Sequence, residues 1–339
     1  MSAMQIYKAE WSAFWCFYAL ACLLAAAILP LFMTSHFATS AEALFTTPVQ
    51  PSTSIVSGLR AVMHDPSGLF ALALLVFGPF TPTLAAYLVS ALKYGGRTVL
   101  EVVDRYKPWR RGVTWREGLG LWGIALAAQA LIMVSINALR LYVVPALGGP
   151  AYEWSAPEIA WGALLGLILL AMFTDGGGLL EETGWRGFAQ PLLQRRISPL
   201  AACLLIGVLW GVWHVPVKFD TISTAWEAPG YFVLFYGLFA IGGAAGSVIY
   251  GYFVNRLGGS ALIAIALHGL GNDSMGLGVG LVDAGAVFDE YQIIPLLFHL
   301  GTQVMPGLVL AVIIAIATRG RLGFREGSTL ESLDADRDG

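Results

Sequence analysis

The sequence predicts an all-α protein, a polytopic membrane protein folded as a bundle of about eight transmembrane helices. Composition is the first reason. Of 339 residues, 57% are hydrophobic and 12% are charged, whereas soluble domains average about 45–50% apolar and about 25% charged residues. So few polar side chains cannot cover a water-soluble core, and the lipid bilayer is the expected partner of this surface. The net charge is −3 and the basic residues are scattered, so no nucleic-acid partner is expected.

Long apolar runs are the second reason, since a membrane-spanning helix takes about 20 mostly apolar residues. The eight candidate runs lie near residues 11–33, 67–92, 118–139, 157–187, 197–217, 230–254, 259–277 and 292–317. The first run is longer than the apolar core of a signal peptide, which has ~7–15 residues. We therefore expect it to be retained as a helix.

The distribution of basic residues is the third reason, because cytoplasmic loops are enriched in Lys and Arg. With eight spans and a cytoplasmic N-terminus, 16 of the 19 basic residues fall in inside segments. The three outside are Arg60, Arg140 and Lys218. A miscounted helix would invert every later loop, so we expect a multi-pass protein of the cell membrane with both termini in the cytoplasm.

The eight helices divide the chain into four parts. Residues 1–156 hold the first three helices, with a polar outer loop at 34–66 and a basic cytoplasmic loop. Residues 157–277 form a core of helices four to seven, which carries most of the unusual polar groups. Residues 278–318 add a loop and the eighth helix. Residues 319–339 hold too few apolar residues to pack and are expected to be a disordered tail.

Helices four, five and seven each carry polar residues that a bilayer disfavours. An ionisable group at the centre of a membrane helix costs at least ~2.5–3.5 kcal/mol, so such groups usually have a function. The three clusters are the segments 181–187 (EETGWRG), 210–216 (WGVWHVP) and 268–273 (HGLGND).

Helical spacing separates the roles of the two glutamates in the first cluster. Glu182 and Arg186 are four residues apart in the acid-first order that favours an ion pair. Glu181 points about 100° away from Glu182 around the helix. We therefore interpret Glu182–Arg186 as a structural brace and Glu181 as the working carboxylate.

The other two clusters supply partners for that carboxylate. His268 and Asn272 share one helix face, as do Trp210 and His214, because each pair is four residues apart. Three helices can therefore bring Glu181, both histidines and the asparagine into one pocket. There the carboxylate could take a proton from water while His and Asn stabilise an oxyanion.

These residues alone leave other interpretations open. A single membrane histidine is more often an interhelical hydrogen-bonding residue, which is how we interpret His299. A relay of Glu181, His214 and His268 would also suit an ion or proton pathway, and a hydrolytic site is only modestly favoured over it.

The three clusters resemble the motifs of the CAAX-protease and bacteriocin-processing family of intramembrane endopeptidases, also called the Abi or type II CAAX prenyl endopeptidase-like family. The resemblance covers roughly residues 157–277. One departure is a tryptophan where the family usually has phenylalanine, a change that keeps an aromatic pocket wall. The matching residues, motif by motif, are Glu181, Glu182 and Arg186; Trp210 and His214; and His268 and Asn272.

The resemblance implies an endopeptidase that hydrolyses a membrane-associated peptide or protein, with CAAX-type processing among the possibilities. It implies that Glu181 and His214 activate water and that His268 and Asn272 stabilise the oxyanion, with Glu182, Arg186 and Trp210 in support. Expected partners are the bilayer and a peptide or protein substrate, which is lipidated for the eukaryotic relatives.

The resemblance leaves the cofactor open between Zn²⁺ and none. Glu181, His214 and His268 are the possible zinc ligands, because sites built from one Glu and two His are known. The chain has no His-Glu-x-x-His motif, and we favour a glutamate mechanism that is metal-free or only weakly linked to a metal.

Two alternatives to a protease remain: a proton- or ion-coupled transporter, and a non-catalytic immunity or scaffold relative. No inverted repeat is visible, which counts mildly against a transporter, and the complete set of polar residues counts against a non-catalytic relative. The protease interpretation has one geometric difficulty. With helix four ending near 187, Glu181 and His214 lie at different depths, unless the helix is broken near Gly176-Gly177-Gly178 or helix five is displaced.

Overall fold

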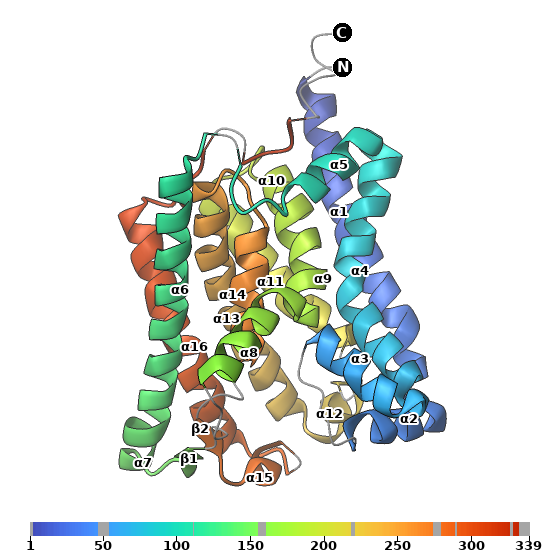
Figure 1. The fold of residues 1–339 in the computed structure, drawn as a ribbon, viewed down its shortest axis with the longest axis vertical. Coiled ribbons are helices and arrows are strands. Elements are labelled where there is room, and N and C mark those ends of the chain that lie inside the picture. Colours follow the sequence, from blue (N-terminus) through green and yellow to red (C-terminus); the bar gives the residue numbers. More distant parts are fainter. Residues whose placement is uncertain are drawn as a thin grey trace.

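Helices make up nearly all of the computed structural model, which describes residues 3–46, 54–110, 112–154, 161–217, 221–273, 279–288, 290–325 and 328–331 (Figure 1). The α-helices are α1 (Ala3–Phe32), α2 (Ser35–Phe45), α3 (Ile55–His64), α4 (Leu69–Tyr94), α5 (Gly96–Asp104), α6 (Trp115–Ala138), α7 (Val144–Ala146), α8 (Trp161–Thr174), α9 (Gly176–Gly184), α10 (Gln190–Leu193), α11 (Pro199–Val217), α12 (Thr221–Glu227), α13 (Pro229–Arg256), α14 (Leu262–Asp273), α15 (Ala284–Phe288) and α16 (Ile293–Ala317).

The remaining elements are short. A 3₁₀ turn, η1 (Pro66–Gly68), precedes α4, and two π-helical segments, η2 (Leu139–Val143) and η3 (Trp185–Ala189), follow α6 and α9. In the described chain, two three-residue strands, β1 (Tyr152–Trp154) and β2 (Val279–Leu281), pair antiparallel.

Five helices in the described chain are long and apolar enough to cross a membrane. They span Glu10–Phe32, Pro66–Tyr94, Trp115–Ala146, Pro229–Arg256 and Ile293–Ala317. Two shorter apolar helices, within α11 and α14, lie among them. The predicted all-α polytopic membrane fold is therefore confirmed, and each of the eight predicted runs contains a helix.

The fourth predicted run is two helices rather than one. Helix α8 ends at Thr174, and α9 begins at Gly176 with Asp175 as its N-cap. The Asp175 carboxylate accepts a hydrogen bond from the Gly178 amide at 2.5 Å, which satisfies a backbone donor at the new helix start. Figure 1 shows α8 running obliquely across the bundle.

The far end of the second helix resolves the difference in depth between Glu181 and His214. Beyond Gly184 the helix carrying Glu181 continues through η3 and α10 to Leu193, past the predicted end at 187. Glu181 is 12 residues before Leu193, about 18 Å along the helix. His214 is 15 residues after the start of α11 at Pro199, about 22 Å along an antiparallel helix. The two side chains therefore lie at similar depths.

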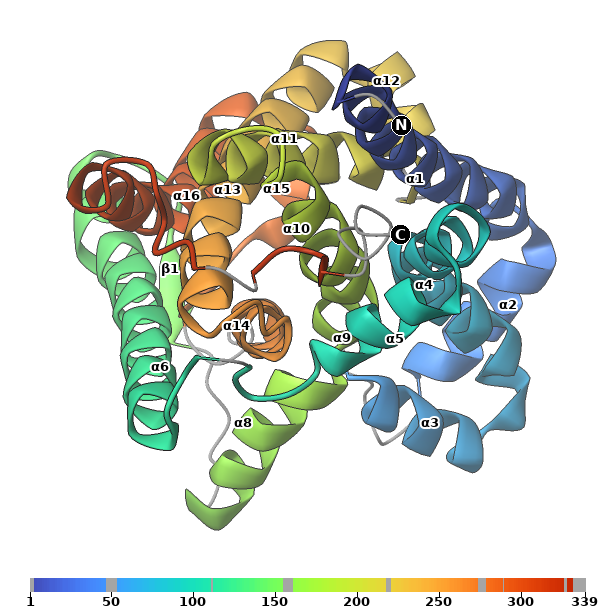
Figure 2. The same cartoon turned by 90° about the horizontal axis from the view of Figure 1, so that it is seen from above.

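Helices that carry polar residues occupy the middle of the bundle. Helix α9 packs against α4 and α14, and α13 packs against α11 and α16. Seen from above, α14 and α9–α10 lie centrally, with α6 and α16 on one side and α1, α2 and α4 on the other (Figure 2). Helices α11 and α13 approach closely, because a Cβ on Gly207 would lie 2.5 Å from the Cα of Ala244. Small residues allow such contacts between membrane helices.

The predicted polar outer loop at 34–66 contains helices where it is described. Thr34 caps α2 by accepting a hydrogen bond from the Phe37 amide at 3.1 Å. Phe37 and Leu44 are buried against α1 and α4 residues. The mostly polar segment carries an apolar face that packs against α1 and α4, and this packing stabilises a helix. The expectation of a loop is therefore corrected for these residues.

Within the segment predicted to be a disordered tail, residues 319–325 and 328–331 are described, and several of them contact the bundle. Leu322 and Leu330 are fully buried. The tail backbone supplies acceptors to two arginines: Arg105 donates to the carbonyl of Thr329 at 2.9 Å, and Arg195 to that of Leu330 at 3.0 Å. Two leucines and backbone carbonyls thus hold a segment whose overall composition is polar. Residues 332–339 lie outside the described chain.

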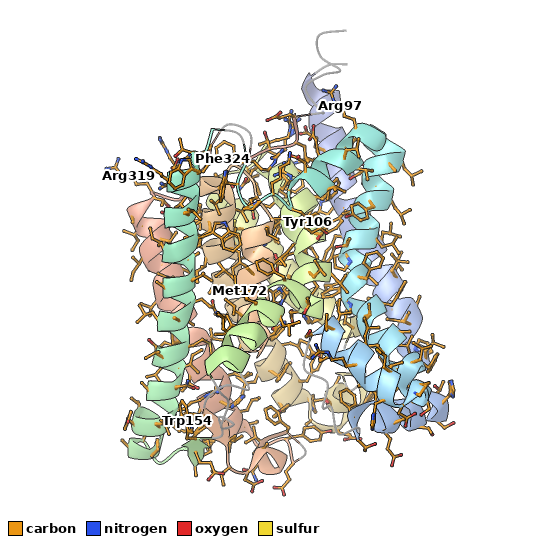
Figure 3. The ribbon with its side chains drawn as sticks, viewed as in Figure 1. Arg97, Tyr106, Trp154, Met172, Arg319 and Phe324 are labelled. Atoms are coloured by element: carbon orange, nitrogen blue, oxygen red, sulfur yellow. The ribbon has the colours of Figure 1, made fainter. Side chains whose placement is uncertain are left out.

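The two ends of the described chain lie at the same end of the bundle. Figure 3 shows Arg97, Arg319 and Phe324 near one end, where α1 also begins, and Trp154 near the other. Both ends of the described chain can therefore lie on one side of the membrane, which agrees with a chain that crosses it an even number of times.

Candidate active site

A cavity of about 450 Å³ lies inside the bundle, between helices α6, α9, α11, α13, α14 and α16. All seven residues that the sequence singled out line it: Glu181, Glu182, Arg186, Trp210, His214, His268 and Asn272. The rest of the lining is largely apolar or glycine. A concave, mostly apolar space with a few converging polar groups is typical of a ligand or catalytic site.

Glu181 is held by the indole that the sequence assigned only to the pocket wall. Trp210 donates from Nε1 to Glu181 Oε2 at 2.7 Å, and the Glu181 side chain is buried. One carboxylate oxygen is thereby fixed, and Oε1 carries no hydrogen bond to another described side chain. Trp210 also stacks on Phe239 of α13, with ring centroids 5.3 Å apart, which fixes the indole plane.

His214 is oriented by its own helix. Its Nδ1 lies 2.8 Å from the carbonyl oxygen of Trp210. A carbonyl only accepts, so Nδ1 carries the proton and the neutral ring has its basic lone pair on Nε2. The ring packs edge-on against Trp210 and Phe239, with centroids 4.4 and 4.7 Å apart. This tautomer suits a group that accepts a proton from water.

Glu182 bridges the arginine and the second histidine. Its Oε2 accepts from Arg186 Nε at 2.8 Å, as the helical spacing predicts. Its Oε1 lies 2.9 Å from His268 Nδ1, a contact that the spacing within helix four could not reveal. Arg186 also donates to Ser247 Oγ on α13 at 2.8 Å. The carboxylate therefore connects α9 to α14 and orients the imidazole of His268.

His268 and Asn272 converge beside a glycine. A Cβ built on Gly177 would lie 3.1 Å from His268 Nε2 and 2.9 Å from Asn272 Nδ2. Asn272 Nδ2 also donates to Asp175 Oδ1 at 3.0 Å, which leaves its second N–H for another acceptor. Both nitrogens thus lie about 3 Å from one point, and when the His268 ring is protonated both carry an N–H, an arrangement suited to stabilising an oxyanion.

Two residues of this site were missed at the sequence level. Asp175 is buried and anchors Asn272 as well as the start of α9. Its signal was an N-cap residue type directly before a helix start. Tyr250 of α13 lines the cavity and lies over both His268 and Arg186, at 6.3 Å between ring centroids and 5.7 Å from the guanidinium carbon. One tyrosine in an apolar helix gave no comparable signal.

The possible zinc ligands Glu181, His214 and His268 share the cavity, but they are not gathered around a common point. Among the described residues, no three His, Cys, Asp or Glu side chains are arranged to hold a metal ion. His268 is turned toward Glu182, and Glu181 toward Trp210. These residues do not fit a metal centre as they stand.

Gly177→Ala is expected to lower the activity of the site strongly while the protein still folds. The added methyl would lie 2.9–3.1 Å from the two nitrogens of Asn272 and His268, and both must shift to admit it. Losing one oxyanion donor typically costs about 10²–10³-fold in rate. Gly123→Ala is the matched control, because nothing lies within 4 Å of its Cβ position. Equal rates for both variants, measured at equal melting temperature, would exclude this role for the two donors.

Comparison with known proteins identifies the same part of the chain. The family described as type II CAAX prenyl endopeptidase Rce1-like matches residues 160–273. A 64-residue stretch is 41% identical to CAAX prenyl protease 2 of Methanococcus maripaludis, covering 19% of this chain and 21% of that relative. The chain thus matches the curated relative over about a fifth of that protein's length.

The matched family segment begins in the fourth predicted run and includes every residue of the three motifs. The resemblance expected from the sequence is therefore confirmed: residues 160–273 match the Rce1-like type II CAAX prenyl endopeptidase family.

Proposed function

We propose that this protein is an intramembrane endopeptidase that hydrolyses a peptide bond in a membrane-associated peptide or protein. The observation that carries the proposal is that Glu181, His214, His268 and Asn272 line one cavity inside the bundle. Each has a hydrogen-bond partner that fixes its orientation. Family membership adds support, since the relative is named as a prenyl protease.

In the proposed mechanism, a water molecule lies between Glu181 and His214. Glu181 takes one proton as the water oxygen attacks the carbonyl carbon of the substrate, and His214 Nε2 accepts a hydrogen bond from the same water. The carbonyl oxygen becomes an oxyanion, which accepts hydrogen bonds from His268 and Asn272. Glu181 then passes its proton to the departing amine as the carbon–nitrogen bond breaks. The products are a new amine and a new carboxylic acid, and the acid ionises by passing the second proton of the water to the amine.

The supporting residues hold this arrangement. When His268 is protonated, it donates from Nδ1 to Glu182 and from Nε2 to the oxyanion, and the Glu182 carboxylate stabilises that cation. When His268 is neutral, the guanidinium of Arg186 balances the negative charge of Glu182. No step is assigned to a metal ion, because the side chains do not fit one.

The proposal includes the orientation in the membrane: both termini in the cytoplasm. Cysteines placed at Trp154 and at Arg97, which lie at opposite ends of the bundle (Figure 3), test it in a variant whose native cysteines are replaced. A membrane-impermeant thiol reagent added outside should label position 154 and spare position 97. The reverse pattern would invert the topology.

The function is tested by incubating the purified full-length protein in liposomes with a membrane-partitioning peptide library, with and without chelator. Cleavage that is retained in chelator and lost in His214→Ala supports the glutamate mechanism. Cleavage that stops with chelator and returns with Zn²⁺ would require a metal step. No cleavage, together with ion flux through the liposomes that Glu181→Gln abolishes, would replace the protease by a transporter.

A further inference from the structure

Two polar side chains line the cavity but have no role in the proposed mechanism. They are Gln129 of α6 and Tyr250 of α13, and both are half-buried. Among the described residues, neither the Gln129 carboxamide nor the Tyr250 hydroxyl has a hydrogen-bond partner. A glutamine in a membrane helix usually hydrogen-bonds to a neighbouring helix, and a buried tyrosine hydroxyl usually finds a partner. These two groups are therefore available to a molecule that enters the cavity.

The two groups converge at a glycine of α14. A Cβ built on Gly271 would lie 3.7 Å from Gln129 Nε2 and 3.9 Å from the hydroxyl oxygen of Tyr250. Gly271 itself lines the cavity, and it has only a hydrogen atom where another residue would have a side chain. The space between the carboxamide and the hydroxyl therefore opens into the cavity.

This space adjoins the two groups that we assign to the oxyanion. Gly271 directly precedes Asn272 and lies three residues after His268, so all three residues lie on one face of α14. The Tyr250 ring stacks on the His268 ring, with centroids 6.3 Å apart and an angle of 22° between the planes. An extended peptide advances ~3.3–3.6 Å per residue. A substrate whose reacting carbonyl lies at His268 and Asn272 therefore brings a neighbouring peptide group to Gly271.

The chemistry of the pair suits a main chain. A carboxamide and a hydroxyl each donate and accept hydrogen bonds without carrying charge. The N–H and C=O groups of an extended peptide need such partners in an apolar cavity, because water is not there to satisfy them. The other α6 residues that line the cavity are the apolar Ile132, Met133 and Ile136. On this wall, the main-chain partner is therefore Gln129.

We propose that Gln129 and Tyr250 form a subsite that hydrogen-bonds the main chain of the substrate at the peptide group next to the cleaved bond. This inference rests on the proposed protease function. The Gln129 carboxamide accepts from the substrate N–H, and the Tyr250 hydroxyl donates to a substrate carbonyl oxygen. The missing side chain of Gly271 leaves room for that peptide group. Because the main-chain groups of a helix are already paired, a helical substrate has to unwind at this subsite.

The test replaces single peptide bonds of the substrate by ester bonds, which keep the shape of the chain but remove one N–H. In peptides of one sequence, an ester takes the place of each peptide bond near the cleaved bond in turn. Mass spectrometry of the products counts only cleavage at the intended peptide bond. In wild-type protein, kcat/KM should fall about tenfold for the ester next to the cleaved bond on one side, the effect of about one lost hydrogen bond. Esters further away should have little effect.

Variants of the two residues connect this loss to the subsite. Gln129→Leu should slow cleavage of the all-amide peptide about tenfold, and the ester should then cause no further loss, because the partner of its N–H is already gone. Tyr250→Phe should also slow the all-amide peptide, but it should keep the ester effect, since Gln129 remains.

Matched controls lie outside the cavity. Tyr252→Phe removes a hydroxyl from the same helix as Tyr250, and Gln292→Leu removes an exposed carboxamide at the start of α16. Both controls should leave the rate and the ester effect unchanged.

Gly271→Ala tests the space rather than its polar walls. The added methyl would lie 3.7 and 3.9 Å from the two polar atoms, which is ordinary van der Waals contact. The melting temperature should therefore stay unchanged while kcat/KM falls, because the methyl takes the place of the substrate's peptide group. If Gln129→Leu does not fold, the wild-type ester series and Gly271→Ala still decide.

The proposal is overturned if no ester position is specifically slow in wild-type protein, or if the full ester effect survives in Gln129→Leu. Either result leaves the protease function intact, because the all-amide peptide is still cleaved. Absence of any cleavage by wild-type protein is a separate result, which removes the proposed function and this subsite with it.

Discussion

Glu181→Gln is expected to reduce the rate of peptide cleavage by about 10²–10⁴-fold, the usual contribution of a general base, while leaving the fold intact. The carboxamide keeps an oxygen that can accept the hydrogen bond from Trp210 Nε1, 2.7 Å away in the native protein. It has almost the same volume in a buried position. What it lacks is an oxygen basic enough to take a proton from water. The measurement is the initial cleavage rate in liposomes alongside the melting temperature.

The control for this variant is Glu42→Gln, an exposed glutamate on α2 far from the cavity in sequence and on another helix. It should leave both the rate and the melting temperature unchanged. Full activity in Glu181→Gln would eliminate the glutamate mechanism. A large drop in its melting temperature would instead show that the carboxylate is needed for folding.

Glu182→Gln is expected to lose stability as well as activity. Two buried groups, Arg186 and His268, share this carboxylate at 2.8 and 2.9 Å, and Glu182 is 1% exposed. Removing one partner of a buried ion pair leaves an uncompensated charge and costs about 3–5 kcal/mol. The free energy of unfolding should fall by that amount. Activity should fall too, because His268 loses the acceptor that orients its ring.

Two further variants separate charge balance from catalysis. Glu117→Gln removes a carboxylate that pairs with Arg256 and Arg325 at the bundle surface, where an ion pair contributes about 0–1 kcal/mol. The double variant Glu182→Gln/Arg186→Met removes both charges of the buried pair and should recover stability without recovering activity. Recovery of both would show that Glu182 has no part in orienting His268.

The sequence predicted the membrane fold and the contents of the cavity well, because both follow from local patterns. Eight apolar runs contain eight helical regions, and the four-residue spacing of Glu182 and Arg186 gave their contact directly. The family relationship came from the same short motifs. Whether Glu181, His214, His268 and Asn272 act as assigned stays a prediction, which the variants above are designed to test.

Contacts between helices could not be predicted from those patterns. The Glu182–His268 and Trp210–Glu181 hydrogen bonds join residues 86 and 29 positions apart, and no spacing rule extends across separate helices. The packed tail was missed for a related reason: composition averages over a segment, whereas Leu322 and Leu330 are individually buried. The depth of Glu181 was misjudged because the apolar run ends near residue 187, whereas the helix continues through η3 and α10 to Leu193.

The ordered tail has a consequence for how the protein is made. Leu330 belongs to the same apolar cluster as Phe14 of the first helix, and Arg195 joins the Leu330 carbonyl to Glu10. These contacts link residues more than 300 positions apart in sequence. The first helix enters the membrane before residue 330 has been synthesised, so this part of its packing surface stays open until that residue has left the ribosome. A nascent chain halted before residue 330 therefore lacks the full core even when all of its motifs are already in the bilayer.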